Sequence, residues 1–214
     1  MMNPFKPRTL PLSDTWLNRL KKDIEESYLR YKEPWKQSGF MMSEEDWVKC
    51  RKPVADCMDK SGTFLDISCS IGYLLESVLS WTKERGLSIT PYGIDASEKL
   101  IKVAKTRLTA FENNLVVANA MSWVSPLKYD FVRADLSYVL IESQEQFLQR
   151  IFNNFLTADG KVILCEFRSK GQDVKEPWSL DKVKNWDFKI VNQVSTFYDK
   201  IEMTRVMVVT RQSI

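Results

Sequence analysis

The stretch GTFLDISCSIGYLLESV, residues 62–78, joins an apolar run to an amphipathic run through a turn of small residues. Residues 63–68 predict a buried strand, and residues 71–86 predict a helix because apolar side chains recur there at helical spacing. Small side chains in the turn between them would let a ligand approach the backbone and the helix N-terminus closely. They also fit the plainer interpretation that the helix starts tightly against the strand.

Strands and helices continue to alternate on both sides of this stretch, which indicates right-handed crossovers and a mostly parallel sheet covered on both faces. The fold class is therefore α/β and doubly wound. The further strands are expected at residues 90–95, 114–120, 128–139, 161–167, 187–197 and 202–212, and the further helices at residues 97–111, 143–156 and 176–186.

The N-terminal part predicts two helices, at residues 14–32 and 43–60, and Ser43 with Asp46 forms a capping box for the second. We therefore divide the chain into a helical cap or lid at residues 1–60 and an α/β domain at residues 61–214. The cap is rich in aromatic side chains, which are expected either to fold over a ligand or to pack on the sheet. They are Tyr28, Tyr31, Trp35, Phe40 and Trp47.

Composition limits the chemistry that the chain can perform. The 214 residues include no histidine, so no Ser-His-Asp relay and no histidine base can form, and carboxylates, Tyr, Lys, Cys or positioning must do any catalysis. Four cysteines without a C-x-x-C pair predict no metal site and reduced thiols in the cytoplasm. The net charge of +3, from 31 basic and 28 acidic residues, does not favour a nucleic-acid partner. We expect neither a signal peptide nor a membrane span, because the sequence shows no apolar run typical of either.

Two strand ends carry polar side chains suited to a nucleoside. Asp95 follows Gly72 by 23 residues, and a carboxylate there can accept both hydrogen bonds of a ribose diol. Capping of the next helix by Asp95 or Ser97 is the alternative. Asn119, followed by Ala120, offers an amide and an apolar surface to an adenine, or simply forms a turn.

Five segments in this order resemble the class I S-adenosylmethionine-dependent methyltransferases, over roughly residues 60–210. The segments are FLDISCSIG, YGIDAS, VVANAMSW, KYDFVRADLSYV and FLTADGKVILCEF. The resemblance implies a seven-stranded, mostly parallel sheet with an antiparallel C-terminal hairpin, S-adenosylmethionine as cofactor, and an N-terminal cap like that of small-molecule methyltransferases. A dehydrogenase would instead show G-x-G-x-x-G, which the turn at residues 68–72 does not continue.

The resemblance also implies how each part of the cofactor is held. Asp66 would hold the methionine ammonium group and Asp95 the ribose hydroxyls, while Arg51 would pair with the carboxylate unless it is simply exposed. Backbone groups at Ser68, Ser70 and Gly72 would contact the methionine portion, and Ala96, Asn119 and Ala120 would surround the adenine.

The chain departs from the family where Ser68 and Ser70 replace two glycines of the Gly-x-Gly-x-Gly turn. A serine adopts positive φ only at a cost. Either the turn uses negative φ at both serines, with their hydroxyls adding contacts, or the cofactor site is weakened. A weakened site would fit a non-catalytic binding protein that keeps the fold.

The strand ending at Asp135 is implied to border the methyl acceptor. Asp135 is expected to accept a proton there, assisted by Tyr138, unless both side chains are structural. The expected acceptor is a small molecule, with an RNA or protein methyltransferase as the alternative. The sequence does not identify the acceptor or the oligomeric state, monomer or dimer.

Overall fold

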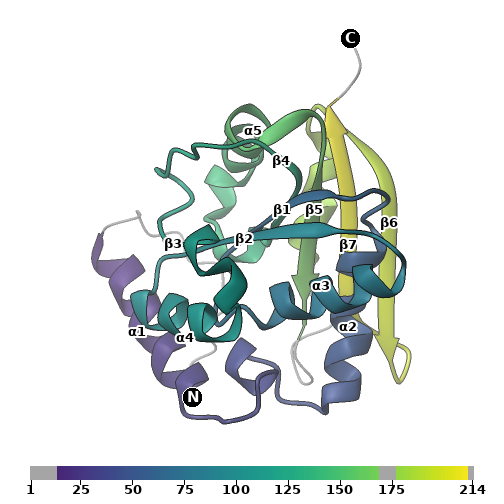
Figure 1. The fold of residues 1–214 in the computed structure, drawn as a ribbon. Helices are drawn as coiled ribbons and strands as arrows, with labels where there is room; N and C mark the ends of the chain where they lie inside the picture. Colours follow the sequence, from purple (N-terminus) through teal and green to yellow (C-terminus); the bar gives the residue numbers. More distant parts are fainter. Residues whose placement is uncertain (1–13, 169–176, 212–214) are drawn as a thin grey trace.

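The computed structural model describes residues 14–168 and 177–211, and these contain one seven-stranded sheet of order β3-β2-β1-β4-β5-β7-β6 (Figure 1). Strands β1 to β5 pair in parallel, and β7 runs antiparallel between β5 and β6. This confirms the predicted α/β fold with its antiparallel C-terminal hairpin. The strands are β1 (Gly62–Ile67), β2 (Ile89–Asp95), β3 (Leu115–Val117), β4 (Tyr129–Ala134), β5 (Leu156–Phe167), β6 (Phe188–Tyr198) and β7 (Ile201–Arg211).

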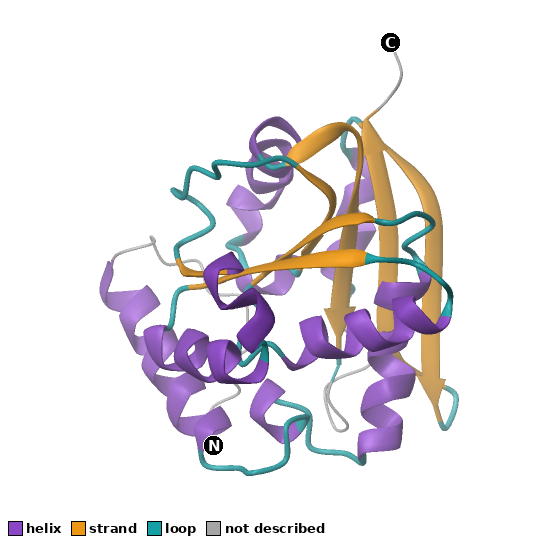
Figure 2. Cartoon of the chain, in the orientation of Figure 1, coloured by secondary structure: helices purple, strands orange, loops and turns teal. Residues whose placement is uncertain are grey.

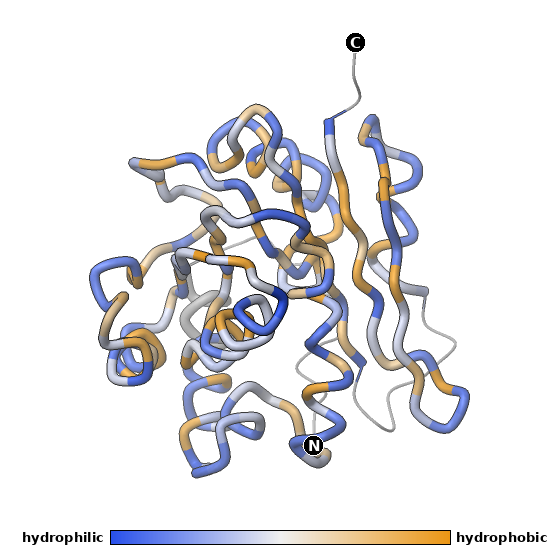
Figure 3. Tube along the Cα trace, turned by 45° about the vertical axis from the view of Figure 1, so that its right-hand side comes forward, coloured by the Kyte–Doolittle hydropathy of each residue, from blue (hydrophilic) through white to orange (hydrophobic). Residues whose placement is uncertain are grey.

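Helices cover both faces of this sheet (Figure 2). Helices α2, α3 and α4 pack on one face through residues such as Trp47, Leu75 and Ile101, and α5 packs on the other through Leu148 and Ile151. Hydrophobic segments run along the strands between these layers (Figure 3). The helices are α1 (Asp14–Leu29), α2 (Glu44–Asp56), α3 (Tyr73–Glu84), α4 (Glu98–Arg107) and α5 (Gln144–Asn154), with short 3-10 helices η1 (Lys36–Ser38), η2 (Thr109–Asn114), η3 (Leu136–Tyr138), η4 (Ile141–Ser143) and η5 (Ser179–Asn185).

Local hydrogen bonds explain where the elements begin and end. The predicted capping box is present at the start of α2, where the Ser43 hydroxyl accepts from the Asp46 amide at 3.1 Å and the Asp46 carboxylate accepts from the Ser43 amide at 3.4 Å. Strand β3 stops at Val117, short of the predicted residue 120, because the Asn119 side chain accepts from the Met121 amide and closes a turn.

Other predicted elements also differ from those found. The strand expected to reach residue 139 ends at Ala134, because the Asp135 carboxylate accepts from the Ser137 amide at 2.9 Å and begins η3. The helix expected at residues 176–186 is described from residue 177 and forms the tighter 3-10 helix η5.

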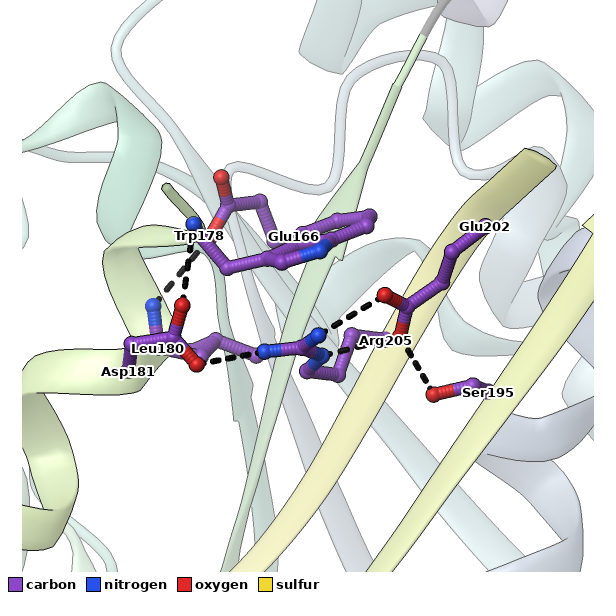
Figure 4. A network of polar contacts seen from close by, with 7 residues as sticks. All are labelled: Glu166, Trp178, Leu180, Asp181, Ser195, Glu202 and Arg205. Carbon is purple, nitrogen blue, oxygen red and sulfur yellow. Dashed lines mark hydrogen bonds and ion pairs between the residues drawn. The ribbon is translucent and has the colours of Figure 1, made fainter. Parts of the chain in front are cut away.

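A polar network fastens η5 to the C-terminal hairpin (Figure 4). The Arg205 guanidinium pairs with Glu202 at 2.7 Å and with Asp181 at 2.6 Å, and it lies 4.9 Å from the ring centroid of Trp178. On β5, the Glu166 carboxylate accepts from the Leu180 amide at 3.3 Å. The network therefore joins β5, β7 and η5 at one end of the sheet.

None of the described helices has the length and apolar character needed to cross a bilayer.

Candidate functional site

A cavity of about 280 Å³ lies at the carboxyl ends of β1, β2 and β4. The sheet order reverses between β1 and β4, because β2 lies on one side of β1 and β4 on the other. Open α/β sheets bind their ligands beside such a reversal. The cavity therefore lies where the topology favours a ligand.

Nearly all the side chains that we predicted for the site come together around this cavity. Gly72 does not line it. Its φ is +74°, and a Cβ atom there would lie 3.2 Å from Ala104 of α4 and 3.2 Å from Leu108, which ends that helix. In the structure this glycine lets α3 start close to α4. The predicted residues that line the cavity are Arg51, Asp66, Ser68, Ser70, Asp95, Ala96, Asn119, Ala120, Asp135 and Tyr138.

The turn after β1 keeps a glycine-like backbone although serines occupy it. Ser68 has φ +62° and Ser70 has φ +52°, so the possibility of negative φ at both serines is wrong. The Ser70 amide donates to the Asp95 carboxylate at 2.9 Å, which ties the turn to the end of β2. The Ser70 hydroxyl oxygen is buried without a hydrogen-bond partner among the described residues. The turn thus places a residue with an unpaired, buried hydroxyl in the wall of the cavity.

Asp95 is held by two backbone groups. Its two oxygens accept from the amides of Ser70 and Ser97, each at 2.9 Å, and burial raises the pKa of its carboxyl. The cap of α4 is supplied by Ser97, whose hydroxyl accepts from the Leu100 amide at 3.2 Å. Asp95 therefore does not act as the helix cap, and each of its oxygens keeps a second lone pair for a ligand.

A buried guanidinium links two of the predicted carboxylates. Arg133 Nη1 lies 3.2 Å from Asp66 Oδ1, and Arg133 Nη2 lies 3.8 Å from Asp135 Oδ2. Burial raises the pKa of Asp66 to about 6, against the opposing charge of Arg133. Burial also raises the pKa of Asp135, whose carboxylate accepts from the Ser137 amide and hydroxyl.

Arg51 is buried rather than exposed, with 9% of its surface accessible. Its guanidinium lies 3.4 Å from the ring centroid of Phe167, and Nη1 has no hydrogen-bond partner among the described residues. Burial lowers the pKa of Arg51 to about 10, so the side chain stays cationic at neutral pH. A buried cation with an unpaired N–H, on a residue that lines a cavity, is suited to an anionic ligand.

Helix α1 forms one wall of the cavity through Lys21, Ile24 and Tyr28. It is fastened to α4 by Glu25, which accepts from the Ser97 hydroxyl at 2.6 Å and pairs with Lys99 at 3.0 Å. Of the five aromatic side chains predicted for the cap, Tyr28 and Trp47 line the cavity. The other three, Tyr31, Trp35 and Phe40, do not line it.

Sequence reasoning missed Arg133 and Phe167 as members of the site. Both line the cavity from the ends of β4 and β5. Arg133 is a charged residue in the buried part of β4, and the parallel register sets it beside Asp66. Its charge was a usable signal, because a charged residue in a buried strand needs a partner. No cluster of His, Cys, Asp and Glu able to hold a metal ion occurs among the described residues.

No protein-family model matches the sequence, and neither does any curated protein. Solved structures match it at low identity. The 1,6-didemethyltoxoflavin-N1-methyltransferase of Burkholderia thailandensis is 16% identical with a TM-score of 0.66, covering 97% of this chain and 94% of that one. A SAM-dependent methyltransferase of Geobacter sulfurreducens is 14% identical with a TM-score of 0.58, covering 90% and 98%. A TehB-like methyltransferase of Corynebacterium glutamicum is 17% identical with a TM-score of 0.58, covering 89% and 99%.

At these identities the likeness shows the fold. The fold is that of the class I S-adenosylmethionine-dependent methyltransferases, as the sequence resemblance predicted.

Proposed function

We propose that the protein binds S-adenosylmethionine in this cavity and transfers its methyl group to a small-molecule acceptor. One observation carries the proposal: the cavity joins two acidic strand ends, Asp66 and Asp95, to two buried polar atoms without partners among the described residues. Those atoms are Arg51 Nη1 and Ser70 Oγ. They provide hydrogen-bond donors and acceptors that a zwitterionic nucleoside would satisfy.

The lining fits each part of the cofactor. Asp66 would hold the ammonium group and Arg51 the carboxylate, while Asp95 would accept the ribose hydroxyls. The remaining part of the cavity, toward the ends of β2 and β3, is largely apolar and would take the adenine. Its lining includes Ala96, Ala118, Asn119, Ala120, Met121 and Phe147.

S-adenosylmethionine, when bound, supplies an activated methyl group, so the protein has mainly to exclude water and to orient the acceptor. Asp135 is the proposed proton acceptor, because its raised pKa makes it a stronger base than an exposed aspartate. The pKa of Tyr138 is raised well above its usual value by burial and by its hydrogen bond to Tyr28. Tyr138 therefore stays protonated, and because its one O–H is directed to Tyr28, it would orient the acceptor by contact rather than by taking its proton.

A small acceptor is supported by the cover that α1 provides over the cavity and by the aromatic lining from Tyr28, Trp47 and Phe167. The methyltransferase structure from Burkholderia thailandensis, which holds 1,6-didemethyltoxoflavin, is an example of this fold with a small molecule bound. The atom that receives the methyl group is not assigned.

Calorimetric titration with S-adenosylmethionine and S-adenosylhomocysteine tests the proposal. We expect binding in the micromolar range and a loss of at least tenfold in Asp95→Ala, because the ribose then loses both acceptor oxygens. Lys22→Ala on the outer face of α1 is the control and should bind normally, since Lys22 is exposed. Absence of binding by the wild type would refute the proposal, and binding without transfer to any acceptor would indicate a non-catalytic binding protein.

The proposed role of Asp135 predicts that Asp135→Asn lowers turnover at least 100-fold with an acceptor that must lose a proton. Cofactor affinity should stay within about twofold, because Asp135 is not one of the proposed cofactor-binding residues. Steady-state kinetics and calorimetry on the same preparation would separate the two effects. An undiminished rate would remove Asp135 from the catalytic site.

A further inference from the structure

Arg133 lies between Asp66, which is proposed to bind the cofactor, and Asp135, which is proposed to accept the proton. It lies on β4 beside Asp66 of β1 in the parallel register, and its guanidinium contacts the Asp66 carboxylate at 3.2 Å and the Ile67 carbonyl at 3.3 Å. Only 6% of Arg133 and 1% of Asp66 is exposed. A buried ion pair of this kind is costly to break, because the remaining charge is left without a partner.

The contact leaves part of the Asp66 carboxylate for a ligand. Arg133 takes Oδ1, and Oδ2 belongs to the same cavity-lining side chain. We propose that Arg133 is a positioning residue that keeps the Asp66 carboxylate ionised and oriented to receive the ammonium group of the amino-acid portion of the cofactor. This inference rests on the proposed function, since it concerns the same site.

The groups around Asp66 explain why its carboxylate needs a cationic partner. Asp95, from β2, faces Asp66 with a like charge, and burial raises the pKa of Asp66 to about 6. Arg133 itself is faced by Asp135 at the end of β4, by Arg51 of α2 and by the Cys165 thiol of β5. With Asp95 and burial both favouring the neutral carboxyl, Arg133 is the neighbour that favours the ionised form.

Two ligands separate this role from general support of the fold. S-adenosylhomocysteine carries the ammonium group, whereas 5′-methylthioadenosine carries the same nucleoside and sulfur without the amino-acid portion. In Arg133→Gln, we expect affinity for S-adenosylhomocysteine to fall roughly tenfold at pH 7 relative to wild type. Affinity for 5′-methylthioadenosine should stay within about twofold, and Arg133→Lys, which keeps the charge, should recover most of the loss.

The pH profile gives a readout that a structural role would not move. The ratio of the variant's affinity to that of wild type for S-adenosylhomocysteine should recover as pH rises from 7 to about 8.5, because Asp66 then ionises without help. Taking the ratio cancels titration of the ligand's own amine. Equal losses for both ligands at every pH, or no loss for either, would overturn the inference.

Wild-type protein keeps the inference testable should Arg133→Gln not fold. Its affinity for S-adenosylhomocysteine should fall relative to that for 5′-methylthioadenosine as pH falls below about 6, where Asp66 takes up a proton. Asp66→Asn should remove this difference between the two ligands, and its persistence there would overturn the inference. A wild type that binds neither ligand would instead refute the proposed function itself.

Discussion

The turn after β1 holds two serines, Ser68 and Ser70, in the left-handed region of backbone conformation. For an L-residue this region costs about 1–2 kcal/mol relative to the right-handed one, whereas glycine adopts it freely. The network of contacts around the turn, including the Ser70 amide on Asp95, keeps the conformation despite this cost. The serines therefore preserve the shape of a glycine turn and store strain in it.

This strain predicts that Ser68→Gly stabilises the protein by about 0.5–1 kcal/mol, the relief being partly offset by the greater freedom of glycine in the unfolded chain. Ser68 is exposed, so its hydroxyl contributes little to packing. Urea unfolding measures the change. Ser80→Gly, in the regular interior of α3, is the control and should destabilise by roughly 0.5 kcal/mol. A destabilised Ser68→Gly would contradict the argument.

Helix α1 contacts parts of the chain that are distant from it in sequence. Glu25 bonds to Ser97, 72 residues away, and Tyr28 packs with Ile71 and Leu100. The helix thus covers the cavity because its inner face contacts the turn after β1 and the start of α4. We infer that a bound ligand and α1 stabilise one another.

We therefore expect the double variant Ile24→Ala/Tyr28→Ala to weaken S-adenosylhomocysteine binding roughly tenfold, about 1.4 kcal/mol, because both side chains line the cavity. The core around Trp47 should keep the variant folded, which circular dichroism would verify. Calorimetry measures the affinity. Unchanged affinity in the folded double variant would rule out a lid that takes part in ligand binding.

The sequence contained enough information for most of the elements and for the edge of the sheet that forms the site. Alternating strands and helices predicted the sheet, and the polar strand ends Asp66, Asp95 and Asp135 fall on one edge because parallel strands end there together. Backbone conformation at the serines could not be predicted, since it depends on contacts that hold the turn. The pairing of Arg133 with Asp66 required the strand register, which joins residues 67 apart.

Buried carboxyls make the stability of the folded protein depend on pH. The pKa of Glu166 is raised to about 7, mainly by burial and then by the charge of Asp135. The folded protein therefore holds this proton more tightly than the unfolded chain. The stability that Glu166 contributes is full below about pH 4.5 and is lost as pH rises through about 7.

Glu166→Gln should consequently be more stable than wild type at pH 8, because glutamine can accept the Leu180 hydrogen bond without ionising. The free energy of unfolding of the variant relative to wild type should be about 1–3 kcal/mol higher at pH 8 than at pH 5. Glu202→Gln is the matched control from the same network. Hydrogen bonds from Arg205 and Ser195 outweigh burial and lower the pKa of Glu202, so this variant should be less stable than wild type at pH 8. Urea unfolding at both pH values measures the differences, and a pH-independent effect of Glu166→Gln would contradict the assignment.

The attachment of α1 to α4 also affects how fast a ligand enters and leaves the cavity. If the cavity exchanges its contents when α1 moves away, the interval between such openings sets how long a molecule stays inside. The pair between Glu25 and Lys99 is partly exposed, so salt should weaken it and speed both entry and departure. Stopped-flow measurement of the intrinsic tryptophan fluorescence, to which Trp47 in the cavity wall contributes, would follow these rates, and equal rates at low and high salt would contradict the idea. In a protein built in this way, the exchange of ligand that follows the movement of α1 would be the slowest step of each cycle.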